Sequence, residues 1–393
     1  MLNLAHDREI RKMKPVLYKS NEMAAQVQPK LAIFLPSLNG GGAERSMLNL
    51  AHGVAERGYA VDLVLAQAKG PYLGGVHKAI RLVDLKASRV LTSLPALARY
   101  LRSEQPEALI SALNYANVVA LWARRLVGIP NRILVNEQNT VSRSAHNSAR
   151  RRQRMMPYLI KRFYPWADYI IGNSQGVADD LIQVTGLPRQ RIKILYNPVV
   201  TPEVREKALA LLDHPWFEPG QPPVVLAVGR LTKQKDFPTL IRAFAQILPN
   251  RPARLLILGE GKDRPILESL VKQLGLEAHV SMPGFVENPY AYMSRASLYV
   301  LSSRWEGLPT VLIEALYCGL PIIATDCPSG PREILADGQH GVLVPPGDIT
   351  ALTRAIGAGL AGETPPPTEE SWYPYSMEAV VDQYIGLLLN GHG

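Results

Sequence analysis

Residues 302–337, SSRWEGLPTVLIEALYCGLPIIATDCPSGPREILAD, place two of their glutamates, Glu306 and Glu314, with seven residues between them. Gly307 and Pro309 follow the first carboxylate directly. Proline suits the first turn of a helix, so we expect Glu306 at the mouth of a helix and Glu314 two turns along it. Two turns return to one helix face. The spacing therefore predicts two carboxylates that line one cleft and bind a long polar ligand, and carboxylates that bind hydroxyl groups indicate a sugar.

The length, composition and net charge of the chain predict two domains and an anionic ligand or surface. The chain has 393 residues, 47% of them hydrophobic, and a formal net charge of +9, which is more chain than one core usually supports. A basic balance favours phosphate-rich ligands or an anionic membrane face. Cys318 and Cys327 have no histidine at zinc-ligand spacing, which predicts neither a metal site nor a disulfide framework. No long apolar run is present, so we expect a cytoplasmic protein whose membrane contact is peripheral.

Apolar runs alternate with helical patterns along most of the chain. The first series runs from LAIFLP at residue 31 to IKILYN at residue 192, and the second from PVVLAVG at residue 223 to GVLVP at residue 341. This alternation is typical of doubly wound, mostly parallel sheets. We predict a loosely ordered extension (1–28), a first domain (29–200), a second domain (201–370) that begins in the proline-rich linker, and a C-terminal helix (371–393) that packs back on the first domain.

Two loops are candidates for binding a phosphate-containing ligand. Gly41 and Gly42 precede a helix, where backbone N–H groups can approach an anion or a sugar hydroxyl. Arg45 stands where the dinucleotide-binding fingerprint requires its third glycine, which makes an oxidoreductase a minor option. Arg230 and Lys235 follow a strand of the second domain, where they suit a departing diphosphate. A tight structural turn and solvated cations are the alternative interpretations of these loops.

The motifs GGGAE, VGRLTKQKDF, LILGEGKDR, PGFVEN, SSRWEGLPTVLIEALYCGLPIIATD and GPREILADGQHGVLVPPGD occur together and in this order. The chain resembles the retaining glycosyltransferases of family 4, which have the GT-B fold of two Rossmann-like domains facing across a cleft. The resemblance implies a metal-independent transferase that needs no cofactor and takes a sugar from a nucleoside diphosphate, most simply a uridine one. It implies catalytic roles for Glu306, Arg230 and Lys235, and donor binding by Glu314, Gly41, Gly42, Gly284, Val286, Asn288, Gly307 and Leu308.

The acceptor side departs from the family pattern. Many relatives carry a histidine where this chain has Glu137-Gln138-Asn139, and we take Glu137 and Asn139 as candidates to bind an acceptor hydroxyl. The basic stretch 143–162, which includes Arg151 and Arg152, predicts contact with an anionic membrane or with the phosphates of a lipid-linked glycan, although a solvated helix face is an equal alternative.

The expected partners are a nucleotide sugar and a lipid-linked or cell-surface glycan, at the inner face of the cytoplasmic membrane. No nucleic-acid motif accompanies the charge, and no nucleic acid is expected. The alternatives in function are a nucleotide-sugar epimerase of the same fold and a sugar-nucleotide-binding scaffold without catalysis.

Overall fold

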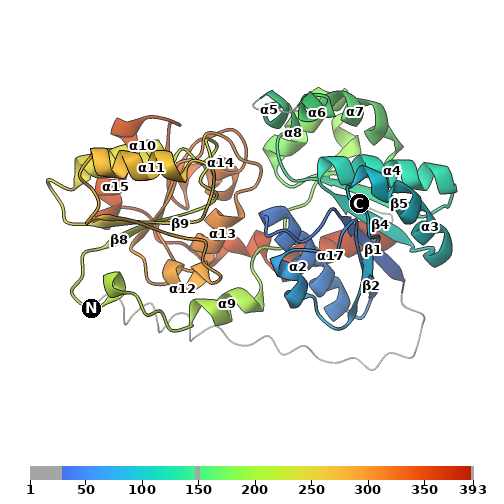
Figure 1. Cartoon of the computed structure of the whole chain (residues 1–393), viewed down its shortest axis with the longest axis horizontal. Helices are drawn as coiled ribbons and strands as arrows, with labels where there is room; N and C mark the ends of the chain where they lie inside the picture. The colour runs from blue at the N-terminus through green and yellow to red at the C-terminus, as the bar shows by residue number, and fades with distance from the viewer. Residues whose placement is uncertain (1–28, 147–150, 391–393) are drawn as a thin grey trace.

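Two parallel sheets organise the molecule. The computed structural model describes residues 29–146 and 151–390, so the predicted extension 1–28 lies outside the described residues. Within them, seven strands form one sheet in the order β3-β2-β1-β4-β5-β6-β7, and six form a second in the order β10-β9-β8-β11-β12-β13. Each sheet lies in its own domain, and the two domains lie side by side (Figure 1). This arrangement confirms the predicted pair of doubly wound α/β domains.

The first domain contains the N-terminal series of elements. Its strands are β1 (Lys30–Leu35), β2 (Ala60–Leu65), β3 (Ile80–Asp84), β4 (Ala108–Ala112), β5 (Arg132–Glu137), β6 (Tyr169–Gly172) and β7 (Ile192–Ile194). Its helices are α2 (Gly42–Glu56), α3 (Leu94–Glu104), α4 (Asn114–Val127), α5 (Val141–His146), α6 (Arg151–Arg154), α7 (Met156–Phe163) and α8 (Gln175–Thr185). The strands are almost continuous apolar runs, as expected for a parallel sheet that is covered on both faces.

The second domain repeats the plan. Its strands are β8 (Val224–Val228), β9 (Arg254–Leu258), β10 (Val280–Gly284), β11 (Leu298–Leu301), β12 (Ile322–Thr325) and β13 (Val342–Val344). Its helices are α9 (Pro202–Ala208), α10 (Phe237–Ile247), α11 (Arg264–Gln273), α12 (Pro289–Met293), α13 (Thr310–Tyr317), α14 (Pro331–Ile334), α15 (Ile349–Leu360) and α16 (Glu369–Trp372). Helices α10, α11 and α15 cover one face of the sheet, and α12 and α13 cover the other.

Three local details differ from the sequence prediction. Helix α15 was not predicted, although Asp348 caps it by accepting a hydrogen bond from the Ala351 backbone N–H at 2.9 Å. Helix α13 begins at Thr310, with Pro309 as its N-cap instead of a residue of its first turn. The last helix, predicted within residues 371–393, is α-helical as α17 (Met377–Ile385) and continues as a π-helix over Gly386–Asn390.

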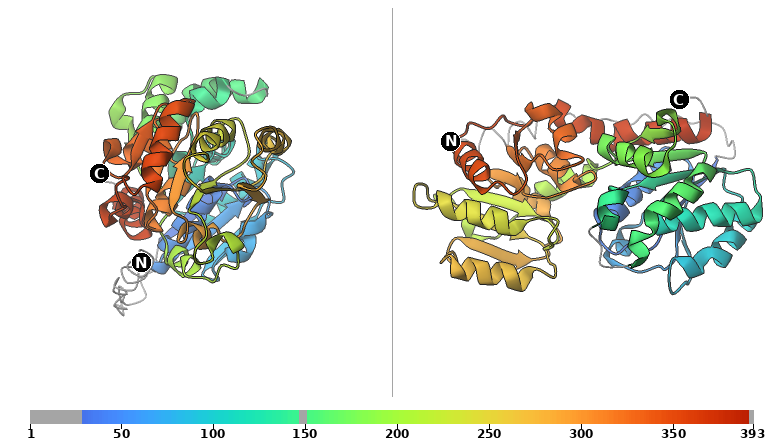
Figure 2. Two further views of the ribbon diagram at one scale, coloured as in Figure 1. Left: turned by 90° about the vertical axis from the view of Figure 1, so that its left-hand side faces the viewer. Right: turned by 90° about the horizontal axis from the view of Figure 1, so that it is seen from above.

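The C-terminal segment crosses from the second domain back to the first (Figures 1 and 2). Tyr384 and Val381 of α17 are fully buried in the core that α2 forms on one face of the first sheet. The Tyr384 hydroxyl accepts a hydrogen bond from Asn136 Nδ2 at 2.6 Å. The two crossing segments also pair with each other, because Val200 and Ser376 form a parallel β-bridge. Two adjacent segments of the chain therefore join the domains.

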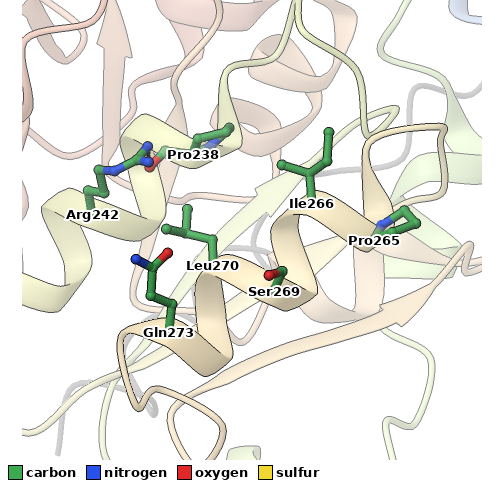
Figure 3. A pocket seen from close by; sticks show the side chains of 7 residues that line it. All are labelled: Pro238, Arg242, Pro265, Ile266, Ser269, Leu270 and Gln273. Carbon is green, nitrogen blue, oxygen red and sulfur yellow. Dashed lines mark hydrogen bonds between the residues drawn. The ribbon is translucent and has the colours of Figure 1, made fainter.

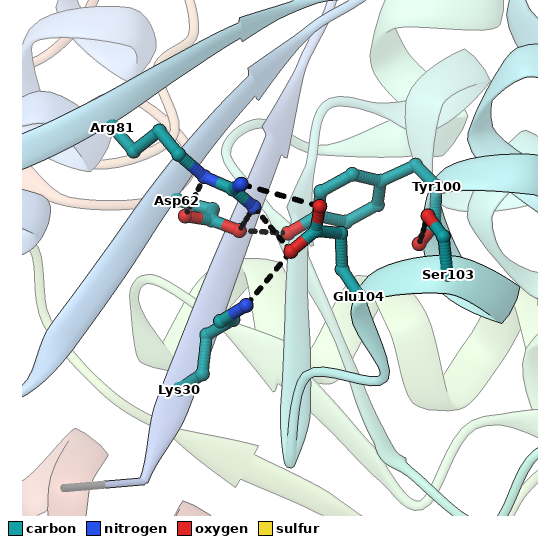
Figure 4. A network of polar contacts seen from close by, with 6 residues as sticks. All are labelled: Lys30, Asp62, Arg81, Tyr100, Ser103 and Glu104. Carbon is teal, nitrogen blue, oxygen red and sulfur yellow. Dashed lines mark hydrogen bonds and ion pairs between the residues drawn. The ribbon is translucent and has the colours of Figure 1, made fainter.

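A network of charges fixes the outer edge of the first sheet (Figure 4). Asp62 on β2 is 3% exposed and accepts hydrogen bonds from Arg81 Nε at 2.8 Å and from the Tyr100 hydroxyl at 2.6 Å. Asp62 and Arg81 are register partners on neighbouring strands, where opposite charges stabilise the pairing. Arg81 and Lys30 both pair with Glu104 and lower its pKa to about 2. The network joins β1, β2, β3 and α3, and we assign it a structural role.

Candidate functional site

Lys235 and Glu306 form a buried ion pair. Glu306 lies near the start of residues 302–337, which we call the glutamate motif. The Lys235 ammonium lies 2.7 Å from Glu306 Oε1, and their side chains are 15% and 8% exposed. Ser303 Oγ donates to the same oxygen at 2.5 Å, and Gln234 Nε2 lies 3.4 Å from Oε2. The structure thus brings two of the three predicted catalytic residues together and fixes the Glu306 carboxylate through three donors.

Arg230, the second predicted loop cation, lies differently. It follows β8 on the same loop as Lys235, but its side chain is exposed, and within residues 29–146 and 151–390 it makes no ion pair. A guanidinium on an open loop is always charged, and it is available to a ligand that approaches the loop.

Glu314 lies inside α13 and is 3% exposed. Its Oε1 accepts a hydrogen bond from the Tyr290 hydroxyl at 3.2 Å and lies 3.4 Å from Arg45 Nη1 of the first domain. Burial raises the pKa of Glu314, while Arg45 and Tyr290 act in the opposite direction. Glu314, which was predicted to bind the donor, therefore lies where the two domains meet.

Close backbone approach at two glycines defines this domain junction. Gly307 forms a β-bridge with Asn139 of the first domain, and a Cβ at Gly307 would lie 2.4 Å from the carbonyl oxygen of Gln138. A Cβ at Gly42, in the first turn of α2, would lie 3.3 Å from Thr310 Oγ1 at the start of α13. The neighbouring Gly41 is the N-cap of α2. These glycines let the first domain lie directly against the glutamate motif.

A second set of contacts supports the junction beside Gly307. Ser174 Oγ lies 2.8 Å from Ser329 Oγ, and Ser329 Oγ also donates to the Gly307 carbonyl at 2.9 Å. Glu333 of α14 accepts a hydrogen bond from the Gln175 backbone N–H at 2.9 Å, at the first residue of α8, where a helix favours negative charge. The domains are therefore in a closed arrangement.

Three residues predicted to bind the donor, Gly284, Val286 and Asn288, lie at the end of β10 and in the turn after it. Gly284 ends the strand with a positive φ of 99°, and Val286 packs against the second-domain core. The Asn288 side chain caps α12 and donates to the Lys207 carbonyl at 2.8 Å, so it is occupied by structural contacts. Leu308, next to Gly307, is 6% exposed and belongs to the same core. A ligand could therefore contact only the backbone groups of these residues and the exposed parts of their side chains.

The structure corrects the prediction for Glu137. Its side chain is 1% exposed and lies inside the first domain, where it accepts hydrogen bonds from Asn117 Nδ2 at 3.1 Å and from the Tyr164 hydroxyl. Burial raises its pKa to about 7, against the lowering effect of these two donors. A sealed carboxyl group cannot receive an acceptor. Asn139, by contrast, lies half-buried at the domain junction, next to Gly307 in the β-bridge.

The basic stretch forms short helices at the end of the first domain (Figure 1). Arg151 and Arg152 of α6 are exposed, and Met155 and Tyr158 beside them are 57% and 68% exposed. Residues 147–150, which include Arg150, lie outside the described residues. We call Arg151, Arg152, Arg154, Met155, Tyr158, Lys161 and Arg162, all of them exposed, the basic surface.

Other features of the described chain add nothing to this site. A groove between α10 and α11 shares no residue with the domain junction (Figure 3), and it is lined by Pro238, Arg242, Pro265, Ile266, Ser269, Leu270 and Gln273. Across residues 29–146 and 151–390, no cluster of three His, Cys, Asp or Glu side chains is placed to hold a metal ion. None of the described helices is both long and apolar enough to span a membrane.

Four side chains that contact Glu306 or Glu314 were not among the predicted site residues. Arg45 and Tyr290 contact Glu314, and Ser303 and Gln234 contact Glu306. Ser303 stands three residues before Glu306, and this local spacing was a usable signal. No local signal exists for Arg45, because its partner Glu314 is 269 positions away.

Comparison with known proteins agrees with this geometry. The family model described as Glycosyltransferase Family 4 matches residues 40–202, and the model described as Glycosyl transferases group 1 matches residues 212–376. Together with the two Rossmann-like sheets, these matches define a GT-B glycosyltransferase. The chain belongs to the group 1 glycosyltransferases of family 4, as the resemblance had indicated.

Two curated relatives cover most of the chain. An N-acetylgalactosamine-N,N'-diacetylbacillosaminyl-diphospho-undecaprenol 4-alpha-N-acetylgalactosaminyltransferase of Campylobacter jejuni is 34% identical over 80% of this chain and 86% of its own. The lipopolysaccharide core biosynthesis glycosyltransferase LpsE of Rhizobium meliloti is 27% identical over 88% of this chain and 96% of its own. The chain is thus related to glycosyltransferases that build lipid-linked glycans and lipopolysaccharide.

Solved structures share the fold at low sequence identity. Anabaena HepE in complex with UDP-glucose superposes with a TM-score of 0.73 at 20% identity, over 92% of this chain and all of that chain. The lipopolysaccharide outer core galactosyltransferase WaaB in its apo form gives a TM-score of 0.70 at 22% identity, over 92% of this chain and all of that chain. At these identities, the likeness supports the fold alone.

Proposed function

We propose that this glycosyltransferase is a retaining enzyme that moves a hexose-type sugar from a nucleoside diphosphate, uridine diphosphate in the first instance, to a hydroxyl group of a lipid-linked or cell-surface glycan. The observation that carries the proposal is the pair of buried carboxylates, Glu306 and Glu314, that the glutamate motif presents at the domain junction. In the proposal, Glu306 binds the transferred sugar and Glu314 binds the ribose of the nucleotide.

In the proposal, the loop after β8 binds the diphosphate of the donor. Lys235 lies 2.7 Å from Glu306, so an ammonium is already next to the position proposed for the sugar. Arg230 on the same loop adds a second cation, and the N–H groups at the start of α2 add further donors. As the bond from the sugar C1 to the phosphate oxygen breaks, negative charge grows on the diphosphate, and fixed cations stabilise it.

Retention follows from attack on the same face of the sugar. The acceptor oxygen forms its bond to C1 as the diphosphate leaves, and the acceptor proton passes to the departing phosphate oxygen. This route requires no separate base. The burial of Glu137 inside the first domain is consistent with it, since a sealed carboxyl group cannot take a proton from an acceptor.

The acceptor is proposed from charge and from relatives. The Campylobacter relative is named for a diphospho-undecaprenol substrate, which is a lipid-linked glycan. The basic surface offers exposed arginines together with Met155 and Tyr158, a combination that suits an anionic membrane face. We place the reaction at that face, with peripheral association of the first domain.

The test is a binding panel followed by product analysis. Calorimetry with UDP, ADP, GDP and their sugars should give the tightest binding for a uridine donor. Incubation with a lipid-linked glycan should then give a product whose new linkage has the anomeric configuration of the donor, as measured by NMR. An inverted linkage would overturn retention, interconversion of sugar epimers without an acceptor would favour the epimerase, and binding without turnover would favour the scaffold.

One substitution tests the diphosphate assignment. Lys235→Ala should lower kcat by about a hundredfold or more, the range typical of a lost charge-stabilising group, while the protein remains folded by circular dichroism. The matched control is Lys233→Ala, which removes an exposed cation two positions away on the same loop. Equal turnover in both variants and in the unmodified enzyme would exclude Lys235 from the reaction.

A further inference from the structure

Arg45 reaches from the first domain to a carboxylate of the second. It lies in the first turn of α2, directly after the glycine loop. Its Nη1 donates to the Tyr290 hydroxyl at 2.8 Å and lies 3.4 Å from Glu314 Oε1. Both partners belong to the second domain, on α12 and α13. The contact therefore exists only while the domains are closed on each other.

Two aromatic rings hold the guanidinium of Arg45 in place. It lies 5.1 Å from the centroid of Tyr72 in the first domain and 5.9 Å from that of Tyr290 in the second. At these distances an arginine is attracted to the ring faces. The Tyr72 hydroxyl also donates to the Gly40 carbonyl at 3.2 Å, which ties the ring to the glycine loop. The position of Arg45 is thus set by both domains and by the glycine loop.

The two oxygens of Glu314 have different surroundings. Oε1 receives Tyr290 and Arg45, whereas Oε2 has no hydrogen-bond partner in the part of the chain that the structure describes. Oε2 is also absent from the set of fully enclosed, unpaired oxygens and nitrogens found among these residues. A carboxylate held at one oxygen and open at the other is oriented to accept hydrogen bonds from a vicinal pair of hydroxyls.

We propose that Arg45 is a positioning residue for nucleotide binding: it completes the ribose-binding carboxylate from across the domain junction, so that tight binding of the nucleotide requires the closed arrangement. The inference rests on the proposed role of Glu314. Arg45 acts through Glu314 and needs no contact of its own with the nucleotide. This positioning role also accounts for the arginine at position 45, after the glycine loop.

Charge gives a second reason for this role. The Glu314 side chain is 4% exposed, and a carboxylate so deeply buried is costly without a cation. The titratable groups around it are Arg45, Tyr290 on α12, Tyr299 on β11 and Cys318 after its own helix, with Tyr72 beside Arg45. Arg45 is the cation in this set. Without it, Glu314 should hold its proton to higher pH and accept hydroxyl groups less well.

The experiment combines changes in the protein with changes in the ligand, so that each variant is measured with each ligand. Calorimetry compares UDP with 2′,3′-dideoxy-UDP, which lacks both ribose hydroxyls, on the full chain and on Arg45→Met, Arg45→Lys and Glu314→Gln. We expect Arg45→Met to weaken UDP about tenfold or more but to leave dideoxy-UDP within twofold, and Glu314→Gln to show the same pattern. Arg45→Lys should recover part of the loss, because it restores a cation.

The pH dependence adds a readout that a purely structural role would not move. In Arg45→Met, the loss of UDP affinity should be larger at pH 6 than at pH 8, because a protonated Glu314 accepts fewer hydrogen bonds. The unmodified chain should be less sensitive over this range. Thermal unfolding of each variant in the absence of nucleotide identifies any that fail to fold, and Arg45→Lys then remains as the test.

The outcomes separate this inference from the proposed function. Equal weakening of UDP and dideoxy-UDP by Arg45→Met would mean a direct contact with the diphosphate or base, and would overturn the inference. Unchanged UDP binding by Arg45→Met would overturn it as well. If the unmodified chain binds no nucleoside diphosphate, the proposed function itself fails. If Glu314→Gln weakens binding while Arg45→Met does not, the proposed function stands and the inference falls.

Discussion

Each of the two glutamates in the motif already has a cation in this structure. Lys235 pairs with Glu306 within the second domain, and Arg45 lies against Glu314 from the first. Buried charges are tolerated when they are paired. In the proposed function, a nucleotide sugar that carries its own diphosphate would therefore meet two carboxylates that already have cation partners, and binding would exchange some of these partners.

Glu137 should make stability depend on pH. Its pKa rises from an ordinary value of 4.5 to about 7 on folding, so the folded chain keeps a proton that the unfolded chain releases. The contribution of Glu137 to stability should then be largest below pH 4.5 and fall as pH rises to about 7, by roughly 3 kcal/mol in all. Glu137→Gln should remove this slope and be more stable than the unmodified chain at pH 8, as measured by urea denaturation.

The control for this prediction is Glu277→Gln, which neutralises an exposed carboxylate elsewhere. It should leave the pH profile unchanged. Parallel profiles for Glu137→Gln and the unmodified chain would mean that folding does not shift the pKa of Glu137.

Sequence reasoning reached some of these residues and not others, for a physical reason. Glu306, Glu314 and Lys235 lie in local motifs; Lys235 pairs with Glu306, and Glu314 contacts Arg45 of the first domain. Glu137 also ends a strand, but the direction of its side chain depends on Tyr164 and Asn117, which the strand pattern does not reveal. Arg45 requires knowledge of how the domains close. Contacts between distant segments are the part that one sequence could not supply.

At the scale of elements, the loop that precedes α13 is where the domains touch most closely. Gly307 lies between Glu306 and the helix, and its carbonyl accepts hydrogen bonds from Ser174 and Ser329 of opposite domains. Its missing Cβ leaves room for the Gln138 carbonyl. The short segment therefore supplies a carboxylate to the proposed site and the contact surface for the first domain.

Gly307→Ala should weaken nucleotide binding by disturbing that contact. The new Cβ would lie 2.4 Å from a backbone oxygen, so the strands must separate. We expect UDP affinity to fall about tenfold, which corresponds to about 1.4 kcal/mol, and the radius of gyration to rise in X-ray scattering.

Gly357→Ala is the matched control for this prediction. Gly357 lies inside α15 with nothing within 4 Å of the position of a Cβ. Alanine there should bind UDP normally and be slightly more stable, because alanine favours a helix over glycine. A Gly307→Ala protein that binds as tightly as this control would rule out a role for the close contact.

Prediction at this scale succeeded for strands and failed for one helix. Strands such as β1 and β8 are continuous apolar runs between turn residues, which is a strong signal. Helix α15, ITALTRAIGAGL, has two glycines and few polar side chains, so it lacks a clear polar face. Its burial against α10 and the strands stabilises it instead.

At the scale of the whole molecule, the basic surface lies on the first domain, away from the loop after β8 in the second (Figure 1). In the proposed function, such a division would let one domain bind a membrane-attached acceptor while the other binds the nucleotide. The overall charge of +9 is consistent with this division but did not by itself locate the surface.

Neutralising the basic surface should weaken membrane binding. Arg151→Gln with Arg152→Gln should lower affinity for vesicles that contain anionic lipid by about 2 kcal/mol, or roughly thirtyfold, at about 1 kcal/mol per cation. Vesicle flotation at low and high salt measures this loss.

Lys272→Gln with Arg354→Gln, two exposed cations of the second domain, is the control and should bind vesicles normally. Binding that is insensitive to salt, or equal in the two double variants, would leave the basic surface as a solvated helix face.

The return of α17 to the first domain has a consequence for how the protein is made. The core beneath α2 is incomplete until Val381 and Tyr384 arrive, and these residues leave the ribosome after the entire second domain. Since domains fold as units during synthesis, the second domain finishes first, and the nascent first domain waits with an apolar face uncovered. Loss of the last fifteen or so residues by premature termination would therefore damage the domain that was translated first.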